Sequence, residues 1–212
     1  MNLAAVILLA SALAPSTCPL GNLVHPSASV GNWINGGEAF AYLVLPRDEG
    51  CVCPVGVRIE RISLMMQFGE AHLQNHFDSR VELCEAVWDV EAGVYRPGAP
   101  FCTSPLATHT IPAIGLYEIY VDLEGACPCV SVGDAYFVTF HLAGSFSPAP
   151  DAVRDDTPDP GISYVDQGSG WEDLVTEHGW QGNSVVRAFA ACCDEPLANE
   201  TRSWGGLKSL FR

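Results

Sequence analysis

The chain has 212 residues, of which 48% are hydrophobic and 17% are charged, so it has enough apolar surface to fold around a core. Its 25 acidic side chains outnumber the 10 basic ones and leave a formal charge of -15. Phosphate backbones and anionic membrane surfaces repel such a polyanion, which argues against nucleic acid as a partner.

The amino terminus has the pattern of an export signal. An apolar run covers residues 3–14, and its last five residues contain two Ala-x-Ala-like cleavage sites, at 10–12 and 12–14. We therefore predict a signal peptide at residues 1–17 and an N-terminal extension at residues 18–37. Pro15 and Pro19 interrupt the run before it reaches the roughly 20 residues of a membrane-spanning helix, so no transmembrane anchor is expected. The alternative is a buried strand or helix of the mature domain.

Short segments that alternate apolar and polar residues follow along the body of the chain, as in strands with one buried face. The expected strands are Phe40–Leu45, Val55–Phe68, Arg80–Trp88, Ala107–Ile111, Leu116–Leu123, Ala135–Leu142, Ile162–Val165 and Ser184–Ala191. In the fifth of these, Tyr117, Ile119, Val121 and Leu123 are expected to point inward.

Two local features refine this prediction. In Val55–Phe68 the apolar positions switch from odd to even across Glu60 and Arg61, which predicts a β-bulge there. Proline and glycine clusters predict turns at 96–100, 147–150 and 157–161.

No stretch of about 12 residues keeps a helical period, so the fold class expected is all-β. We predict a disulfide-stabilised two-sheet β-sandwich of about eight antiparallel strands, jelly-roll-like, over residues 38–195. A linker and C-terminal tail would then occupy residues 196–212.

Nine cysteines in a chain with an export signal indicate an oxidising compartment and disulfides. Bonds within Cys-x-Cys or Cys-Cys pairs are strained, so each member should bond to a distant partner. We predict that Cys51, Cys53, Cys127, Cys129, Cys192 and Cys193 bond among themselves. Cys84 would pair with Cys102, leaving Cys18 unpaired, removed with the signal, or available for an intermolecular bond.

A zinc site is the alternative for four of these cysteines. Two pairs of cysteines build tetrahedral structural zinc sites, and Cys51, Cys53, Cys127 and Cys129 offer two such pairs. Their spacing is one residue shorter than the usual zinc knuckle, and an exported protein meets oxidants first.

Calcium is the other metal ion for which the sequence offers candidate ligands. The acidic segment that contains Asp155, Asp156 and Asp159 carries carboxylate oxygens of the kind that calcium prefers, although its spacing is not that of an EF-hand. The alternative is a solvated loop in which these side chains cap turns.

Aromatic side chains suggest a carbohydrate platform, because their rings stack against sugars. The candidates are Trp88, Tyr95, Trp171 and Trp180, together with Trp33, and core packing is the alternative for each. His72 and His76 have a metal-ligand spacing, but they fall in a connection between strands. No nucleophile elbow, phosphate-binding loop or Cys–His catalytic pattern occurs, so no catalytic residue is assigned.

The order of several short motifs is similar to that of uncharacterised secreted β-sandwich domains of environmental bacteria. They are Cys51-x-Cys53-Pro54, Arg96-Pro97-Gly98, Asp155-Asp156-x-Pro158, Ser163-Tyr164, Gly170-Trp171 and Val186-Arg187-Ala188. The resemblance covers roughly residues 38–195 and implies fold and secretion without an activity.

The C-terminal tail resembles the Trp-Gly-x-x-Lys-x-Leu-Phe-Arg ends of secreted bacterial proteins, in the segment from Trp204 to Arg212. This implies a tag that a sorting or anchoring system reads. The alternative is a last strand or helical turn that packs on the domain.

These observations favour a non-enzymatic structural or adhesive protein that is secreted or displayed at the cell surface. Its partner would be an extracellular glycan or protein. The alternatives are a carbohydrate-binding module and a secreted hydrolase. The first predicts exposed aromatics on one sheet face, and the second predicts a cleft with carboxylates or histidines of shifted pKa.

Overall fold

The structure is a computed structural model that describes residues 17–31, 33–69, 76–123, 125, 127–144 and 150–193. Most of the predicted signal peptide, His72 and the predicted tail at 196–212 lie outside these residues. The described part contains thirteen strands and no helix, and accordingly no helix in it could cross a membrane.

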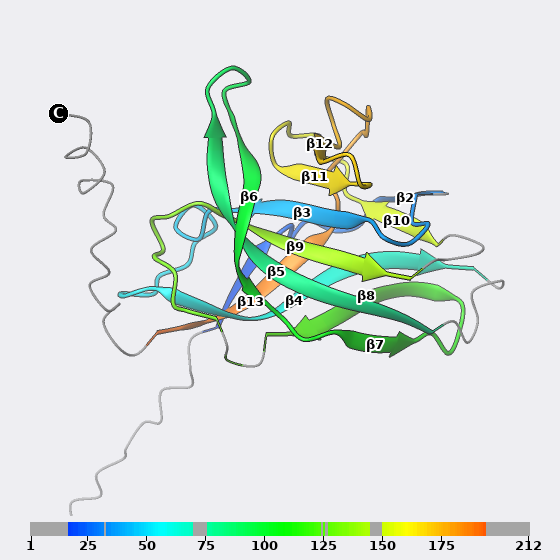
Figure 1. Cartoon of the computed structure of the whole chain (residues 1–212), viewed down its shortest axis with the longest axis horizontal. Helices are drawn as coiled ribbons and strands as arrows, with labels where there is room; N and C mark the ends of the chain where they lie inside the picture. Colours follow the sequence, from blue (N-terminus) through cyan, green and yellow to red (C-terminus); the bar gives the residue numbers. More distant parts are fainter. Residues whose placement is uncertain are drawn as a thin grey trace, which may run out of the picture.

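The strands form two antiparallel sheets that pack face to face (Figure 1). Sheet A has the order β1-β13-β4-β10-β2, with β8 paired to β4, and consists of β1 (Thr17–Gly21), β13 (Val186–Cys192), β4 (Val57–Phe68), β10 (Asp151–Arg154), β2 (Ala28–Val30) and β8 (Gly115–Asp122). Sheet B has the order β12-β11-β3-β9-β5-β6, with β7 paired to β5, and consists of β12 (Trp171–Asp173), β11 (Ser163–Asp166), β3 (Ala39–Val44), β9 (Tyr136–Ala143), β5 (His76–Asp89), β6 (Val94–Thr103) and β7 (Ala107–Thr110).

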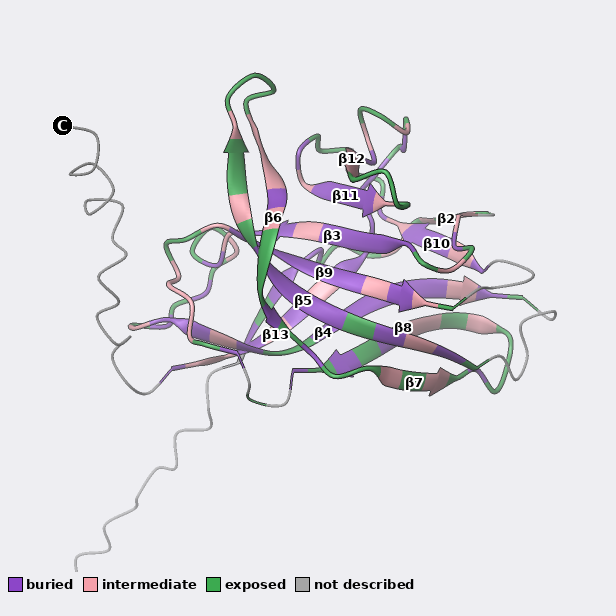
Figure 2. Ribbon diagram, in the orientation of Figure 1, coloured by how far each residue is buried: buried purple, intermediate pink, exposed green. Residues whose placement is uncertain are grey.

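The core lies between the two sheets, where alternate side chains of each strand meet. Ile62 and Leu64 of β4 and Val138 and Phe140 of β9 are all buried in this one cluster. Figure 2 shows the buried stretches along the middle of both sheets. The chain crosses between sheets at β3, β4 and β5, and again from β8 to β11, as in a jelly roll.

The predicted two-sheet, disulfide-stabilised β-sandwich is thus confirmed, with thirteen strands in place of about eight. The predicted bulge is also confirmed. Phe189 of β13 pairs with Arg61 and Ala190 pairs with Ile59, so Glu60 is the extra residue on β4. Ile119, Val121 and Leu123 are buried, and Tyr117 packs against the core as expected.

The turn predicted at 96–100 is wrong, because this segment lies within β6. Proline has no N–H for a ladder, but β6 pairs with β5 alone, and the pairing shifts register twice between Pro97 and Cys102. Gly98 is needed there, since a Cβ at this position would lie 2.6 Å from Cγ2 of Val87. Strands β1, β2, β10 and β12 also lie outside the expected set, and β1 and β2 fall in the predicted extension.

Four disulfides tie the ends of the strands together, namely Cys18–Cys51, Cys53–Cys192, Cys102–Cys127 and Cys129–Cys193. All six cysteines of the two Cys-x-Cys pairs and the Cys-Cys pair bond to distant partners, as predicted. Two of them bond outside that set, to Cys18 and Cys102.

The pairing predicted for Cys84 with Cys102 is wrong. The expectation that Cys18 forms no bond within the chain is also wrong. Cys84 is a free, buried thiol on the outer side of sheet B, where it belongs to a second apolar cluster with Phe137 and Tyr164. Strand β1 pairs with β13 and thereby brings Cys18 to the Cys51 side of the sandwich. Sequence distance could not reveal this, because β1 and β13 come from opposite ends of the chain.

Candidate functional site

The far end of the β5–β6 pair is a hairpin that stands away from the sandwich (Figure 1). Its residues are mostly exposed at the tip, as Figure 2 shows. Trp88 of β5 pairs with Tyr95 of β6, and their rings meet edge to face with centroids 5.0 Å apart. Trp88 is 52% exposed and Val90 is 83% exposed. An aromatic and aliphatic surface is therefore presented to solvent at the most protruding part of the sheet.

The turn of this hairpin is fixed by Asp89. Its Oδ1 accepts backbone hydrogen bonds from Glu91 (3.0 Å) and Ala92 (3.1 Å), and its Oδ2 lies 3.0 Å from Nε of Arg96. The hydrogen bond from Ala92, followed by that from Arg96, lowers the pKa of Asp89. The carboxylate therefore holds both the turn and the neighbouring strand.

The hairpin is anchored to β11 and β12 through Tyr95 and Arg96, the segment that we call its root. The hydroxyl of Tyr164 donates to the carbonyl of Tyr95 at 2.6 Å, and Arg96 donates to the carbonyl of Trp171 at 3.2 Å. The guanidinium of Arg96 also lies over the Tyr164 ring, 5.9 Å from its centroid. These contacts hold the exposed tip in a defined position, which reduces the entropy that binding would cost.

Beside this root, a polar row crosses the outer face of sheet B. The pairing of β5, β9, β3, β11 and β12 places Arg80, His141, Ala39, Asp166 and Trp171 in one line. His141 lies 3.0 Å from Glu82 and its ring is 6.5 Å from that of Trp171. Burial lowers the pKa of His141, although the Glu82 carboxylate opposes this shift. The imidazole is accordingly neutral over most of the physiological range.

The four predicted platform aromatics do not form one surface. Trp88 and Tyr95 lie together on the hairpin, and Trp171 lies at its root through Arg96. Trp180 is only 5% exposed and packs edge to face on Trp33, with centroids 5.0 Å apart. It is a core residue, because the loop after β12 folds it inward, and it is removed from the platform.

The three predicted calcium ligands are also separated. Asp155 is 1% exposed, and its two oxygens accept hydrogen bonds from Asn22, Thr157 and Asn183. Asp156 and Asp159 are exposed. In the described residues these three carboxylates do not form a group with metal-ligand spacing, and calcium at this loop stays a prediction.

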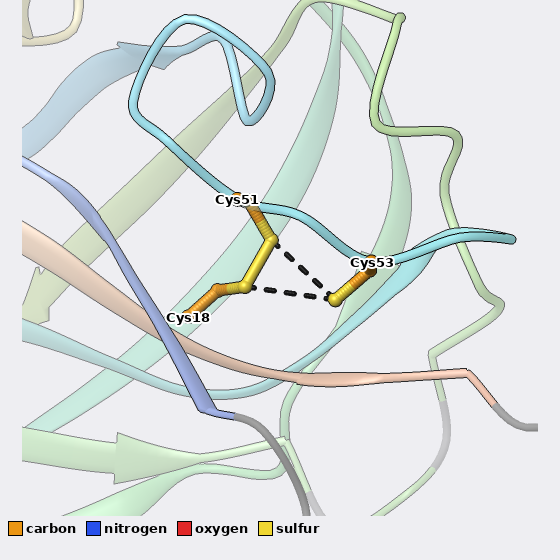
Figure 3. Close-up of side chains that lie close together, drawn as sticks. All are labelled: Cys18, Cys51 and Cys53. Atoms are coloured by element: carbon orange, nitrogen blue, oxygen red, sulfur yellow. Dashed lines mark hydrogen bonds between the residues drawn. A yellow bond between two sulfur atoms is a disulfide. The ribbon is translucent and has the colours of Figure 1, made fainter.

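The described residues do bring Cys18, Cys51 and Cys53 together, as Figure 3 shows. Sγ of Cys53 lies 3.6 Å from Sγ of Cys18 and 3.5 Å from Sγ of Cys51. Zinc binds thiolates, and all three sulfurs are in disulfides, as are those of Cys127 and Cys129. The oxidised protein therefore lacks the four thiolates of the zinc alternative. The cluster consists of two neighbouring disulfides, Cys18–Cys51 and Cys53–Cys192.

Two potential nucleophiles among the described residues are inaccessible. Cys84 is buried, and desolvation raises the pKa of its thiol to about 12, so it is not a thiolate at neutral pH. Ser79 lies 2.7 Å from Nε2 of His109, but its side chain is fully buried. Neither side chain offers a reacting atom to a substrate.

One concave site was missed at the level of the sequence. An open hollow of about 440 Å³ lies on the outer face of sheet A, beside the bulge in β4. It is lined by Arg58, Glu60, Arg61, Asp122, Gly125 and Phe189. The sequence signal for it was the phase slip at Glu60 and Arg61, because a bulge turns these two consecutive charged residues to the same face of the sheet.

Comparison with known proteins adds information on the fold. No protein-family model matches the chain, and no curated protein matches it. Among solved structures, the chain is similar to the structure of the cysteine protease and lectin-like domains of Cwp84, a surface layer associated protein of Clostridium difficile. The two share 13% sequence identity with a TM-score of 0.50 over 76% of this chain. This chain spans 33% of that structure, and the likeness extends to the fold alone.

Proposed function

We propose that the protein is a non-enzymatic adhesive module of the extracellular space or cell surface, and that it attaches through the tip of the β5–β6 hairpin. One observation carries the proposal, namely that Trp88 is 52% exposed on a protruding hairpin with a fixed root. Tryptophan contributes more than most side chains to binding when a partner covers it. Without a partner, the exposed apolar surface of Trp88 forgoes the free energy that burial would give.

The compartment is supported by the disulfides. Four disulfides in one domain are typical of proteins that fold and work in oxidising surroundings. The lectin-like part of the matched structure is compatible with an adhesive role but does not assign one to this chain. Ser79 and Cys84 are buried, so neither is available as the nucleophile of the hydrolase alternative.

The test compares the full chain with the variant Trp88→Ala. Depletion from solution is measured against insoluble polymers of two kinds, polysaccharide (chitin and cellulose) and protein (collagen). We expect wild-type protein to bind one of them, and Trp88→Ala to weaken that binding about thirtyfold, since an interface tryptophan contributes about 2 kcal/mol or more.

The matched control is Leu106→Ala, which removes another exposed apolar side chain away from the hairpin. It should bind as the wild type does and keep its unfolding temperature, whereas Trp88→Ala should lower that temperature by only about 2 to 4 °C through the lost contact with Tyr95. If Trp88→Ala binds as tightly as the wild type, the hairpin is not the contact. If the wild type binds none of the polymers, the adhesive proposal fails for these surfaces.

A further inference from the structure

The hollow on the outer face of sheet A owes its shape to the bulge in β4. On a regular strand, neighbouring residues point to opposite faces. Because Glu60 is the extra residue opposite β13, both Glu60 and Arg61 are exposed although they are consecutive. Arg58 precedes them on the same outer face. The bulge therefore gathers three charged side chains within four positions of one strand.

Neighbouring strands complete the lining. Arg61 pairs with Asp122 of β8 on one side and with Phe189 of β13 on the other. Nε of Arg61 lies 2.6 Å from Oδ1 of Asp122, so these two exposed side chains form an ion pair within the lining. Phe189 is half-buried, and its ring lies 5.9 Å from that of Tyr120, so an aromatic wall borders the charged groups.

Several polar groups in the hollow have no partner within the described part of the chain. The side chains of Arg58 and Glu60 make no hydrogen bond or ion pair there, and Asp122 uses only one carboxylate oxygen. The next row of the sheet contrasts with this. Glu118 accepts hydrogen bonds from Ser63 (2.7 Å) and Tyr120 (2.6 Å) and lies 3.4 Å from Arg187. Among the described residues, donors and acceptors are thus unpaired in the hollow and paired in the row beside it.

We propose that this hollow binds a neutral saccharide unit of an extracellular polysaccharide. Arg58 would donate hydrogen bonds to sugar oxygens, Glu60 and Asp122 would accept them from hydroxyls, and the Phe189 ring would pack against the apolar C–H face of the sugar. The hollow has a volume of about 440 Å³ and is open to solvent, which suits one unit of a polymer that continues beyond the site.

Charge selects this ligand class. Two guanidinium groups and two carboxylates line the hollow among the described residues, so these four charges balance. The chain as a whole carries -15, which disfavours an anionic polymer such as a polyuronate. A cation is not favoured either, because the described residues bring no three metal-ligating side chains together here. The site is separate from the hairpin and does not depend on the adhesive role of Trp88.

The experiment is affinity electrophoresis of the full chain in native gels that contain soluble dextran, mannan, mixed-linkage β-glucan or polygalacturonate. We expect one of the three neutral polysaccharides to retard the wild type. Arg58→Ala and Phe189→Ala should each raise the apparent Kd at least tenfold. Arg47→Ala is the matched control, because it removes an exposed arginine outside the hollow with the same change of charge.

Each result has a defined meaning once thermal unfolding has shown that the variants are folded. Loss of retardation in both hollow variants, with Arg47→Ala and Trp88→Ala unchanged, supports the saccharide site even if the hairpin proposal fails. The site is refuted if none of the neutral polysaccharides retards the wild type, or if polygalacturonate retards it most. It is also refuted if Arg47→Ala weakens binding as much as Arg58→Ala, or if only Trp88→Ala abolishes it.

Discussion

Replacing Asp155 by alanine is expected to destabilise the fold by about 3 kcal/mol. Asp155 follows β10 and joins its own loop, through Thr157, to two distant segments, through Asn22 after β1 and Asn183 before β13. The backbone N–H groups of Thr157 and Asn183 donate to its Oδ1 at 3.0 and 2.7 Å. A hydrogen bond to a charged group contributes about 1.5 to 3 kcal/mol, and alanine leaves the buried N–H of Asn183 without an acceptor, whereas Thr157 is exposed and its N–H can bind water.

Two observations bear on the size of this loss. The side chain of Asn22 keeps a hydrogen bond to the carbonyl of Ser184 at 3.0 Å, so it adds little to the loss. The surroundings are also tightly packed, because a Cβ at Gly182 would lie 2.0 Å from the carbonyl oxygen of Asp155. At about 2 to 4 °C per kcal/mol for a domain of this size, the unfolding temperature should fall by about 6 to 12 °C.

The assay is thermal unfolding followed by near-UV circular dichroism under non-reducing conditions. Asp156→Ala is the control, because this neighbour is exposed and its replacement should change stability by less than about 0.5 kcal/mol. A fall of less than about 2 °C for Asp155→Ala would refute the view that this carboxylate holds the three segments. The same assay with calcium chloride or EDTA tests the calcium prediction, which requires a rise in unfolding temperature with calcium.

Two further predictions concern the cysteines. Replacing both Cys53 and Cys192 by serine should destabilise the protein more than replacing both Cys102 and Cys127, because the bonds span 139 and 25 residues, for which loop entropy predicts about 5 and 3.5 kcal/mol. Denaturant titration of the two double variants measures this, and equal losses would show that loop length does not govern the effect. The Cys84 thiol should resist iodoacetamide at pH 8 in the folded protein, because burial raises its pKa to about 12, and it should react once the protein is unfolded. Intact mass of the labelled protein reports this, and rapid labelling of the folded form would contradict the buried position.

Much of the strand pattern could be predicted from the sequence, because it depends on local periodicity. The alternation in Phe40–Leu45 and Leu116–Leu123 identified β3 and β8, and the phase slip at Glu60 and Arg61 located the bulge. The disulfide-rich character followed from the number and spacing of the cysteines. These features require no knowledge of which segments meet in space.

The partners across the fold were decided only by the tertiary structure. Cys18 bonds to Cys51 because β1 pairs with β13, and the prolines of β6 are tolerated because that strand lies at an edge. Trp88 and Trp180 look alike in the sequence, yet one is exposed on a hairpin and the other is buried. The hollow beside the bulge likewise needs Asp122 and Phe189 from two other strands. A periodic pattern specifies which face of a strand is apolar, but only the packing of remote strands determines what that face meets.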